Sequence, residues 1–375
     1  MDTPVDLKKT VDVKTIFGFL EELAPLRLAE DYDNPGFLAG DAAAPVSRAL
    51  LVLDITPEAV REAEKTGAQL LISHHPVIFK PVRAVLARGK TAALWELARR
   101  NVAAVCMHTN LDAAPGGVND ALAAALGLQN AEPFGSALSE PYKKIVVFVP
   151  KTHARAVREA LAAAGAGHLG AYDGCAFASS GTGYFRPLPG AKPFLGRPGE
   201  PEEADEVRVE ALCAPELLPR TVAAMLAAHP YEMPAYDVFD DAAVQKVYGM
   251  GRVADLGREL PLAEFAAGVK RALRASCVRA VDSGRPVRRA AVCGGAVDSA
   301  IVSAAAAAGA DTLVTGECKH SLYYEARAQN LNVVEAGHFA TETVVLPVLR
   351  EKLAAKFPGV EFGVAACNRE PYFTV

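Results

Sequence analysis

The sequence predicts an α/β protein with mostly parallel sheets, interrupted by a smaller inserted α+β domain. Continuously apolar segments alternate with helical patterns, as is typical of parallel strands covered by helices on both faces. The pattern changes in the middle of the chain and then resumes, and 375 residues exceed what one ordinary core needs. We therefore expect residues 1–135 and 244–375 to form two halves of one α/β domain, with 136–243 inserted as a ferredoxin-like unit.

The first half contains three helical patterns and three apolar strands. An amphipathic helix is expected at Val13–Leu23 with Asp12 as its N-cap, and a second at Pro57–Thr66 opened by Thr56. A third, Thr91–Asn101, carries the only tryptophan. The strands are predicted at 49–53, 69–72 and 102–107.

The middle and the last part of the chain follow different patterns. A strand–helix–strand, strand–helix–strand order in the middle predicts a small ferredoxin-like module. Its predicted elements are strands at 144–149 and 206–211 and helices at 154–164 and 217–228. After it, strands are expected at 289–293, 312–315 and 332–335, and helices at 298–308 and 338–353.

Composition excludes several classes of protein. The chain is 51% hydrophobic with a net charge of −5, which describes a globular protein and argues against a nucleic-acid partner. No apolar stretch approaches the roughly 20 residues that span a bilayer, and Met1–Asp6 lacks the start of a secretory signal. The seven cysteines are scattered without Cys-x-x-Cys spacing, which argues against a thiolate zinc site. We expect a cytoplasmic protein with no membrane partner.

Three polar segments follow predicted strands. Histidine is scarce, with eight in the chain, yet His74 and His75 stand together directly after an apolar segment. Ligands of open α/β sheets bind beyond the carboxyl ends of the strands, so these segments are expected to converge. They are Ser73-His74-His75-Pro76, His108-Thr109-Asn110-Leu111-Asp112 and Gly337-His338-Phe339-Ala340-Thr341-Glu342.

The residue types in these segments predict a metal centre. His338 and Glu342 are four residues apart, on one face of a helix, which suits two ligands of one centre. Neighbouring residues of an extended chain point to opposite sides, so His74 and His75 are expected to reach different ions. His108 is expected to orient the ligands without binding an ion itself. The predicted ligands are His74, His75, Asp112, His338 and Glu342.

Five ligands suit a pair of ions better than one. A catalytic zinc usually takes three protein ligands, and two ions would need a shared carboxylate or water to complete their sites. Nitrogen and oxygen donors without sulfur suit zinc, manganese, iron or cobalt. We therefore predict two divalent metal ions as cofactors, with zinc as the first choice.

The ordered motifs resemble the NIF3-like family, whose bacterial members are called GTP cyclohydrolase 1 type 2 homologues. The resemblance covers essentially the whole chain, and the middle is similar to the inserted PII/CutA-like domain of the longer members. It implies a dinuclear centre on the five ligands and a homohexameric toroid with the metal sites facing an internal cavity. The motifs include the three segments above, Glu30-Asp31-Tyr32-Asp33-Asn34-Pro35-Gly36, Thr315-Gly316-Glu317, Tyr172-Asp173-Gly174-Cys175-Ala176-Phe177 and His229-Pro230-Tyr231-Glu232.

One position departs from the family pattern. The family commonly has a histidine where this chain has Ser321, and here His320 stands one residue earlier. Whether His320 contributes to the cavity stays open.

These observations predict a metal-dependent hydrolase. Two ions would activate a water, and Glu317 or His108 would shuttle protons. The expected substrate is a nucleotide-like or phosphorylated small molecule, and GTP is suggested by the resemblance alone. The alternative is a non-catalytic regulatory or scaffold ring that binds metal and senses a small molecule with its inserted domain.

Several features keep two interpretations. Ser179-Ser180-Gly181-Thr182-Gly183 fits either a phosphate-binding loop or a plain glycine-rich hairpin. His229-Pro230-Tyr231-Glu232 fits either a buried polar cluster or a pocket wall. Glu317 is either an acid–base group or a solvated carboxylate at a strand end, and Gly294-Gly295 is expected to form a tight turn.

Overall fold

The computed structural model describes residues 11–375, apart from the side chains of Ser136 and Ala137. The start of the chain considered above, Met1–Asp6, lies outside the described residues. Contacts divide the chain into two compact units, one holding the described residues up to Leu138 together with Tyr248–Val375, the other Ser139–Val247. None of the described helices is both long and apolar enough to cross a membrane.

The first sheet of the first unit has the strand order β1-β4-β3-β2-β13. Its four strands from β4 to β13 are parallel, and β1 is an antiparallel edge strand. Helices α1 and α12 pack in the core on one face, and α2 and α3 in the core on the other. The elements are α1 (Val13–Leu23), β1 (Gly36–Ala39), β2 (Arg48–Val52), α2 (Pro57–Thr66), β3 (Leu70–Ser73), α3 (Ala92–Arg100), β4 (Ala103–Cys106), α12 (Val345–Lys356) and β13 (Glu361–Val364).

Side-chain caps explain why two of these helices begin where the sequence predicts. The Asp12 carboxylate accepts a hydrogen bond from the backbone N–H of Thr15, 2.8 Å away, at the start of α1. The Thr56 hydroxyl accepts from the N–H of Ala59 at 3.2 Å, and Pro57 occupies the first helical position of α2. Gly67, with φ of +72°, ends α2 in the left-handed conformation. Both predicted helices are confirmed.

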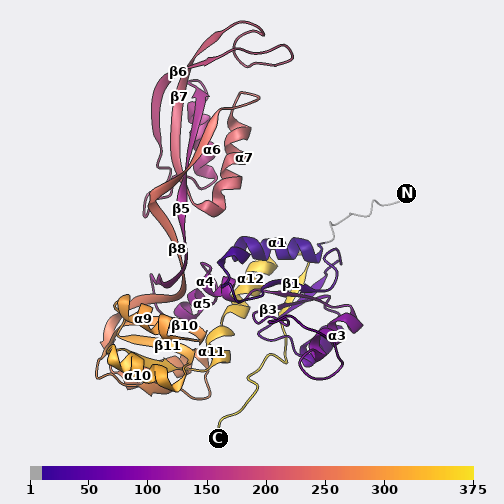
Figure 1. Cartoon of the computed structure of the whole chain (residues 1–375), viewed down its shortest axis with the longest axis vertical. Helices are drawn as coiled ribbons and strands as arrows, with labels where there is room; N and C mark the ends of the chain where they lie inside the picture. Colours follow the sequence, from indigo (N-terminus) through magenta and orange to yellow (C-terminus); the bar gives the residue numbers. More distant parts are fainter. Residues whose placement is uncertain (1–10) are drawn as a thin grey trace. The chain divides into compact units, whose positions relative to one another are not determined.

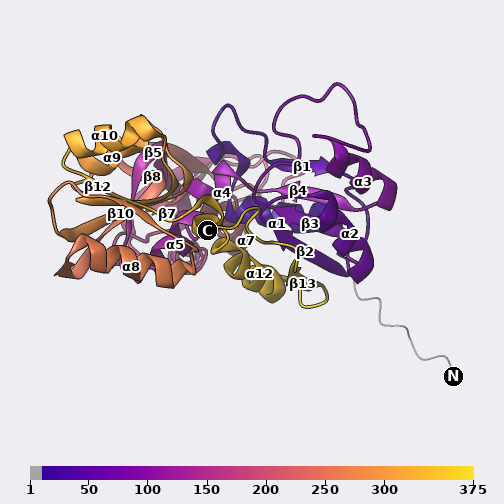
Figure 2. The same cartoon turned by 90° about the horizontal axis from the view of Figure 1, so that it is seen from below.

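The second sheet has eight strands in the order β6-β7-β5-β8-β10-β11-β12-β9. Its part in the first unit runs from β8 to β9, with β10, β11 and β12 parallel. Helix α8 lies on one face and α9 and α10 lie on the other, as Figure 2 shows. Helix α5 shares the core of α8. The elements are α4 (Thr109–Ala113), α5 (Val118–Ala125), β8 (Tyr236–Leu260), α8 (Leu262–Leu273), β9 (Arg279–Val281), β10 (Val287–Ala296), α9 (Ser299–Ala307), β11 (Thr312–Glu317), α10 (His320–Ala328), β12 (Asn332–Glu335) and α11 (His338–Glu342).

The helix predicted at 338–353 is two helices, α11 and α12. The break at Thr343 and Val344 comes just before Pro347. Proline has no N–H, and its ring clashes with the carbonyl four residues earlier, here that of Thr343. The single-helix prediction was therefore wrong, and α11 is a short segment that serves the candidate site.

The second unit contains helices α6 and α7, which pack on one part of the eight-stranded sheet (Figure 1). The strand order in this part is β6-β7-β5-β8, and β7 is antiparallel to both of its neighbours. Helices α6 and α7 lie side by side and bury Val157, Leu161 and Met225 against the strands. The elements are β5 (Glu132–Pro150), α6 (Ala154–Ala163), β6 (Phe177–Phe185), β7 (Glu202–Cys213) and α7 (Leu218–Ala228).

The glycine-rich segment Ser179–Gly183 lies in the middle of β6, paired in register with β7. The phosphate-binding interpretation was wrong. The segment is part of one strand of the consecutive antiparallel pair β6 and β7, as a hairpin requires, although the connection between the two strands lies further along the chain. Strand pairing holds the backbone extended, which excludes the curled conformation that would aim successive N–H groups at an anion.

Candidate metal centre

Each predicted ligand lies just beyond a parallel strand. His74 and His75 follow β3, and Asp112 lies in the short helix α4 that follows β4, the parallel neighbour of β3. His338 and Glu342 begin and end α11, which follows β12 of the second sheet. The structure therefore brings residues from both halves of the first unit to one place.

Glu342 is at the centre of this cluster. Its Oε2 atom lies 3.0 Å from Nε2 of His75 and 3.1 Å from Nε2 of His338. Its Oε1 atom lies 3.7 Å from Nε2 of His74, which is also 3.5 Å from Oδ1 of Asp112. The Nε2 atoms of His75 and His338 are only 3.3 Å apart. Three imidazoles and two carboxylates thus point their free donor atoms at one small volume.

The other nitrogen of each imidazole faces an oxygen. Nδ1 of His74 donates to the carbonyl of Met107 at 2.9 Å, and Nδ1 of His75 donates to Oδ1 of Asp54 at the same distance. Nδ1 of His338 lies 3.6 Å from Oε1 of Glu317. Metal-ligating histidines usually show this arrangement, because the oxygen fixes the tautomer and leaves the Nε2 lone pair for the ion.

Three atoms of the cluster are buried without a hydrogen bond of normal geometry among the described residues: Nε2 of His74, Oδ1 of Asp112 and Oε2 of Glu342. His74 is 1% exposed and Glu342 is 4% exposed. Buried polar atoms without partners are costly, so their convergence indicates a missing partner. A cation would satisfy all three, and the residues fit a metal ion.

Gly295 at the end of β10 leaves space for Glu342. Its φ is +64°, and a Cβ atom there would fall 2.1 Å from Oε1 of Glu342. The prediction of a tight turn at Gly294-Gly295 was wrong: both glycines lie in β10, where its register with β11 shifts between Cys293 and Ala296. Gly295 is a wall of the candidate centre, where a side chain would displace the central carboxylate.

The charges of the cluster shift its pKa values strongly. Burial lowers the pKa of His75, but its hydrogen bonds to Asp54 and Glu342 outweigh burial and raise it to about 10. Burial raises the pKa of Asp112. For Glu342, burial raises the pKa, but the charge of His74 and the hydrogen bonds from the imidazoles lower it well below its usual range. The carboxylates therefore make this site favourable for positive charge.

The expectation that His74 and His75 point to opposite sides was wrong. Strand β3 ends at Ser73, so neither histidine belongs to an extended strand, and the two ring centroids lie 5.2 Å apart. Two sets of ligand atoms lie close enough to hold an ion: one is His74, His75 and His108, the other His75, His338 and Glu342.

Two carboxylates that were not among the predicted site residues position the histidines. Asp54 follows β2, the parallel neighbour of β3, and contacts His75. Asp33 lies in the turn-rich segment after α1, and its Oδ1 accepts from Nδ1 of His108 at 2.7 Å. Its Oδ2 accepts from the backbone N–H of Thr109 at 3.1 Å. Asp54 could have been found from its place at a strand end, whereas only the fold brings Asp33 to His108.

Asp33→Asn should lower the free energy of unfolding, and by more at neutral pH than at acidic pH. Burial raises the pKa of Asp33, but the hydrogen bonds from His108 and Thr109 outweigh it and lower the pKa to about 2. A lowered pKa stabilises the fold above pH 4, and this contribution, about 2 kcal/mol, is lost as the pH falls towards 2. Denaturant unfolding at pH 6 and at pH 2.5 should show a larger difference between wild type and variant at pH 6. An equal difference at both values would contradict this.

The cluster opens into a cavity of about 880 Å³. His75, His108, Asp112, His338 and Glu342 line it, together with Tyr32, Phe79 and Lys319. Glu317 ends β11 close to His338 with an exposed side chain. His320 begins α10 and makes ring contacts with Tyr323 and Tyr324.

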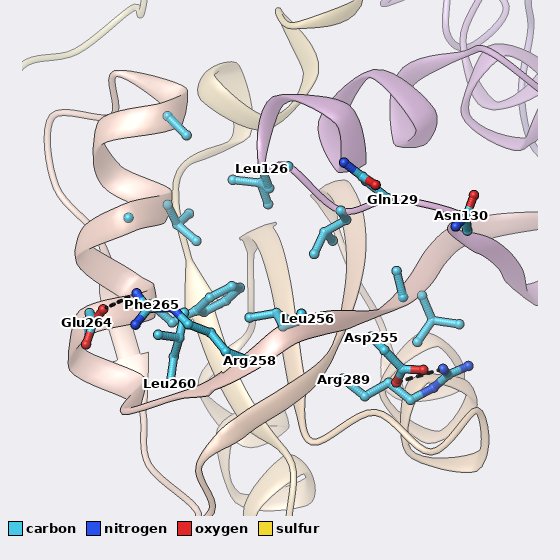
Figure 3. A pocket seen from close by; sticks show the side chains of 18 of the residues that line it. Leu126, Gln129, Asn130, Asp255, Leu256, Arg258, Leu260, Glu264, Phe265 and Arg289 are labelled. Carbon is cyan, nitrogen blue, oxygen red and sulfur yellow. Dashed lines mark hydrogen bonds and ion pairs between the residues drawn. The ribbon is translucent and has the colours of Figure 1, made fainter.

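A second cavity of the first unit, about 970 Å³, lacks comparable chemistry (Figure 3). Its walls are apolar residues such as Leu126, Leu256 and Phe265. Four of its charged side chains form two ion pairs, Arg289 with Asp255 at 3.0 Å and Arg258 with Glu264 at 2.9 Å. Among its described lining residues there is no histidine, so we place the functional site at the Glu342 cluster.

The fold and this cluster define a mixed α/β protein with a candidate metal site built from histidine and carboxylate side chains. The chain belongs to the Duf34/NIF3 (NGG1p interacting factor 3) family, whose model matches residues 11–371.

Similar proteins cover nearly the whole chain. It is 38% identical over 347 residues to the Halalkalibacterium halodurans protein named GTP cyclohydrolase 1 type 2 homolog, covering 92% of this chain and 93% of that protein. It is 37% identical over 360 residues to the Bacillus subtilis protein of the same name, covering 96% of each. The crystal structure of a Bacillus cereus protein related to NIF3 superposes with a TM-score of 0.87 at 37% identity, over 98% of this chain and all of that one.

Proposed function

We propose that the chain is a dinuclear metal-dependent hydrolase acting on a nucleotide-like or phosphorylated small molecule. One observation carries the proposal: the two oxygens of Glu342 face two different sets of ligands. Oε1 faces His74 and, beyond it, Asp112, whereas Oε2 faces His75 and His338. Together these five side chains would hold two divalent ions, of which zinc is our first choice and manganese, iron or cobalt the others.

Such ions would supply Lewis acidity and a water of lowered pKa for hydrolysis. The protein supplies orientation and proton transfer. Asp33 holds Nδ1 of His108 protonated, which leaves Nε2 of His108 as the proton acceptor. The exposed Glu317 carboxylate, beside His338, provides a second route for protons to leave the cavity.

Two exposed aromatic rings support a nucleotide-like substrate. Tyr32 and Phe79 line the cavity, are 64% and 42% exposed, and their ring centroids lie 6.4 Å apart. Exposed rings beside a polar cluster suit stacking against a flat heterocycle. Lys319, in the same lining, suits a phosphate group. The names of the relatives make GTP the first compound to test.

Tyr32→Ala should raise the KM for a nucleotide substrate about two- to tenfold while leaving kcat within about twofold, because the lost stacking acts on binding. The control is Tyr172→Ala, which removes an equally exposed tyrosine of the second unit. Steady-state kinetics check both variants. A fall in kcat with unchanged KM would contradict a binding role for Tyr32.

The hydrolase proposal is tested with a panel of nucleotides and phosphoesters, GTP included, offered to the metal-loaded protein. We expect turnover that His74→Ala and Glu342→Gln abolish and that tracks the metal content. If no compound is consumed and His74→Ala changes only the metal content, the proposal fails. The alternative, a non-catalytic metal-binding ring with a sensing insert, would then take its place.

We also propose a homohexameric toroid and a PII/CutA-like insert, as the family resemblance implies. The strand and helix order of the second unit, β5-α6-β6-β7-α7-β8, supports the second proposal. The homohexamer is tested by size-exclusion chromatography with light scattering. A mass other than that of six chains would refute it.

A further inference from the structure

The second unit contains a cavity of about 400 Å³ lined by aromatic side chains. Phe148 comes from β5, Phe185 from β6, Phe194 from the connection between β6 and β7, and Tyr231 from the segment after α7. The ring of Tyr231 contacts Phe185 with centroids 5.8 Å apart and Phe194 with centroids 6.3 Å apart. Tyr231 is therefore the centre of an aromatic cluster that faces the cavity.

Two carboxylates accompany these rings. Oε1 of Glu206 accepts a hydrogen bond from the Tyr231 hydroxyl at 2.9 Å, and Oε2 of Glu232 accepts from the backbone N–H of Lys192 at 3.2 Å. Within the described part of the chain, neither carboxylate forms an ion pair with a lysine, arginine or histidine. Arg186 also lines the cavity, which leaves the lining with an excess of one negative charge.

The pKa of Tyr231 reflects this charge. Burial raises the pKa of its hydroxyl, and the hydrogen bond to Glu206 and the nearby charge of Glu202 raise it further. Negative charge therefore reaches the aromatic cluster, where it would favour a cation and oppose a phosphate.

Hydrogen bonds of His229 and the packing of Glu206 on Gly183 fix the positions of Tyr231 and Glu206. Nε2 of His229 donates to the carbonyl of Phe148 at 2.9 Å, and the backbone N–H of Tyr231 donates to Nδ1 of His229 at 3.1 Å. The Glu206 carboxylate lies over Gly183, where a Cβ atom would fall 2.3 Å from Oε2. The segment His229–Glu232 thus combines both interpretations left open by the sequence: His229 is a buried polar anchor, and Tyr231 and Glu232 are the pocket wall.

We propose that this cavity binds a small organic cation, an ammonium compound with a compact apolar body. Ring faces carry negative charge and attract cations, and the volume suits a small molecule. Glu206 would complement the positive charge, and the rings of Tyr231, Phe185 and Phe194 would surround the alkyl groups. The site is separate from the metal centre and does not depend on the proposed hydrolysis.

The test compares choline with 3,3-dimethylbutan-1-ol, which has the same shape without the charge, on the full-length metal-loaded protein by titration calorimetry. We expect choline to bind saturably and more tightly than the alcohol by about two- to thirtyfold, the range that cation–ring attraction gives. Glu206→Gln should weaken choline binding at least twofold while leaving binding of the alcohol unchanged, because it removes the carboxylate and keeps the rings. Glu342→Gln should leave choline binding unchanged while it alters the metal content.

Glu203→Gln is the matched control, because Glu203 lies on the same strand with its side chain on the opposite face, and it should not change choline binding. Phe194→Ala, an exposed ring, gives a second variant that should weaken binding even if Glu206→Gln does not fold. The proposal is overturned by equal affinity for both compounds, by absence of saturable choline binding, or by equal losses in Glu203→Gln and Glu206→Gln.

Discussion

Glu342→Gln is expected to remove most of the bound metal from the protein. The glutamine amide is a poor ligand, and its NH₂ group would face imidazole nitrogens that lie 3.0 and 3.1 Å from the present Oε2. At an ion concentration about 100 times the dissociation constant, binding stabilises a fold by about 2.7 kcal/mol. We expect the variant to lose most of this metal-dependent gain, measured by elemental analysis and by denaturant unfolding with and without the ion.

Glu317→Gln is the control for this experiment. It removes the same charge, but the Glu317 side chain is exposed and lies 3.6 Å from His338 Nδ1, on the side of the ring that faces away from Glu342. Its metal content should stay close to wild type and well above that of Glu342→Gln, because the glutamine oxygen can still face Nδ1 of His338. If Glu342→Gln keeps the wild-type metal content, the centre is not built around Glu342, and the dinuclear proposal fails with it.

Gly295→Ala should damage both the fold and the metal centre. The added methyl group would fall 2.1 Å from Glu342 Oε1, and the φ of +64° is unfavourable for alanine. The left-handed conformation costs about 1–2 kcal/mol and overpacking about 1–3 kcal/mol, so we expect a total loss of about 2–5 kcal/mol. Metal affinity should fall together with stability, because Glu342 must move to admit the methyl group.

Gly67→Ala is the control that separates the cost of the left-handed conformation from the cost of the contact with Glu342. Gly67 has a φ of +72°, but a Cβ atom there meets no other atom within 4 Å. This variant should lose only the conformational part, about 1–2 kcal/mol, and keep its metal content. Equal losses of stability and metal in the two variants would show that contact with Glu342 is not what makes Gly295 necessary.

The sequence predicted those elements whose boundaries depend on local chemistry. Thr56 with Pro57, and Asp12 with Thr15, set helix starts through short-range hydrogen bonds, so the printed sequence carries the signal. The prediction of one helix at 338–353 failed because a single residue opposes the helical pattern. The apolar periodicity of 338–353 continues through a position that Pro347 makes unfavourable, and the helix breaks there.

The predicted ligands could be assembled from the sequence because each lies near the end of a strand. The groups that orient these ligands could not be predicted in this way. Asp33 reaches His108 across 75 positions, and His74 is oriented by the carbonyl of Met107, an atom that every residue type possesses. The glycine-rich segment was misread as a phosphate-binding loop because Gly181 and Gly183 are typical of loops. Both lie in a paired strand, and the space needed by Glu206 accounts for Gly183.

Strand β13 pairs with β2 at the edge of the first sheet, and the ion pair Arg48–Glu361 there joins residues 313 positions apart. At about 5–20 residues per second, a ribosome needs roughly 15–60 seconds to make the intervening chain. Throughout that time β2 has an open edge, which is a template for wrong pairing. The nascent protein should therefore depend on chaperones more than its final stability suggests, and truncation before Glu361 should cause aggregation even though every candidate ligand would still be present.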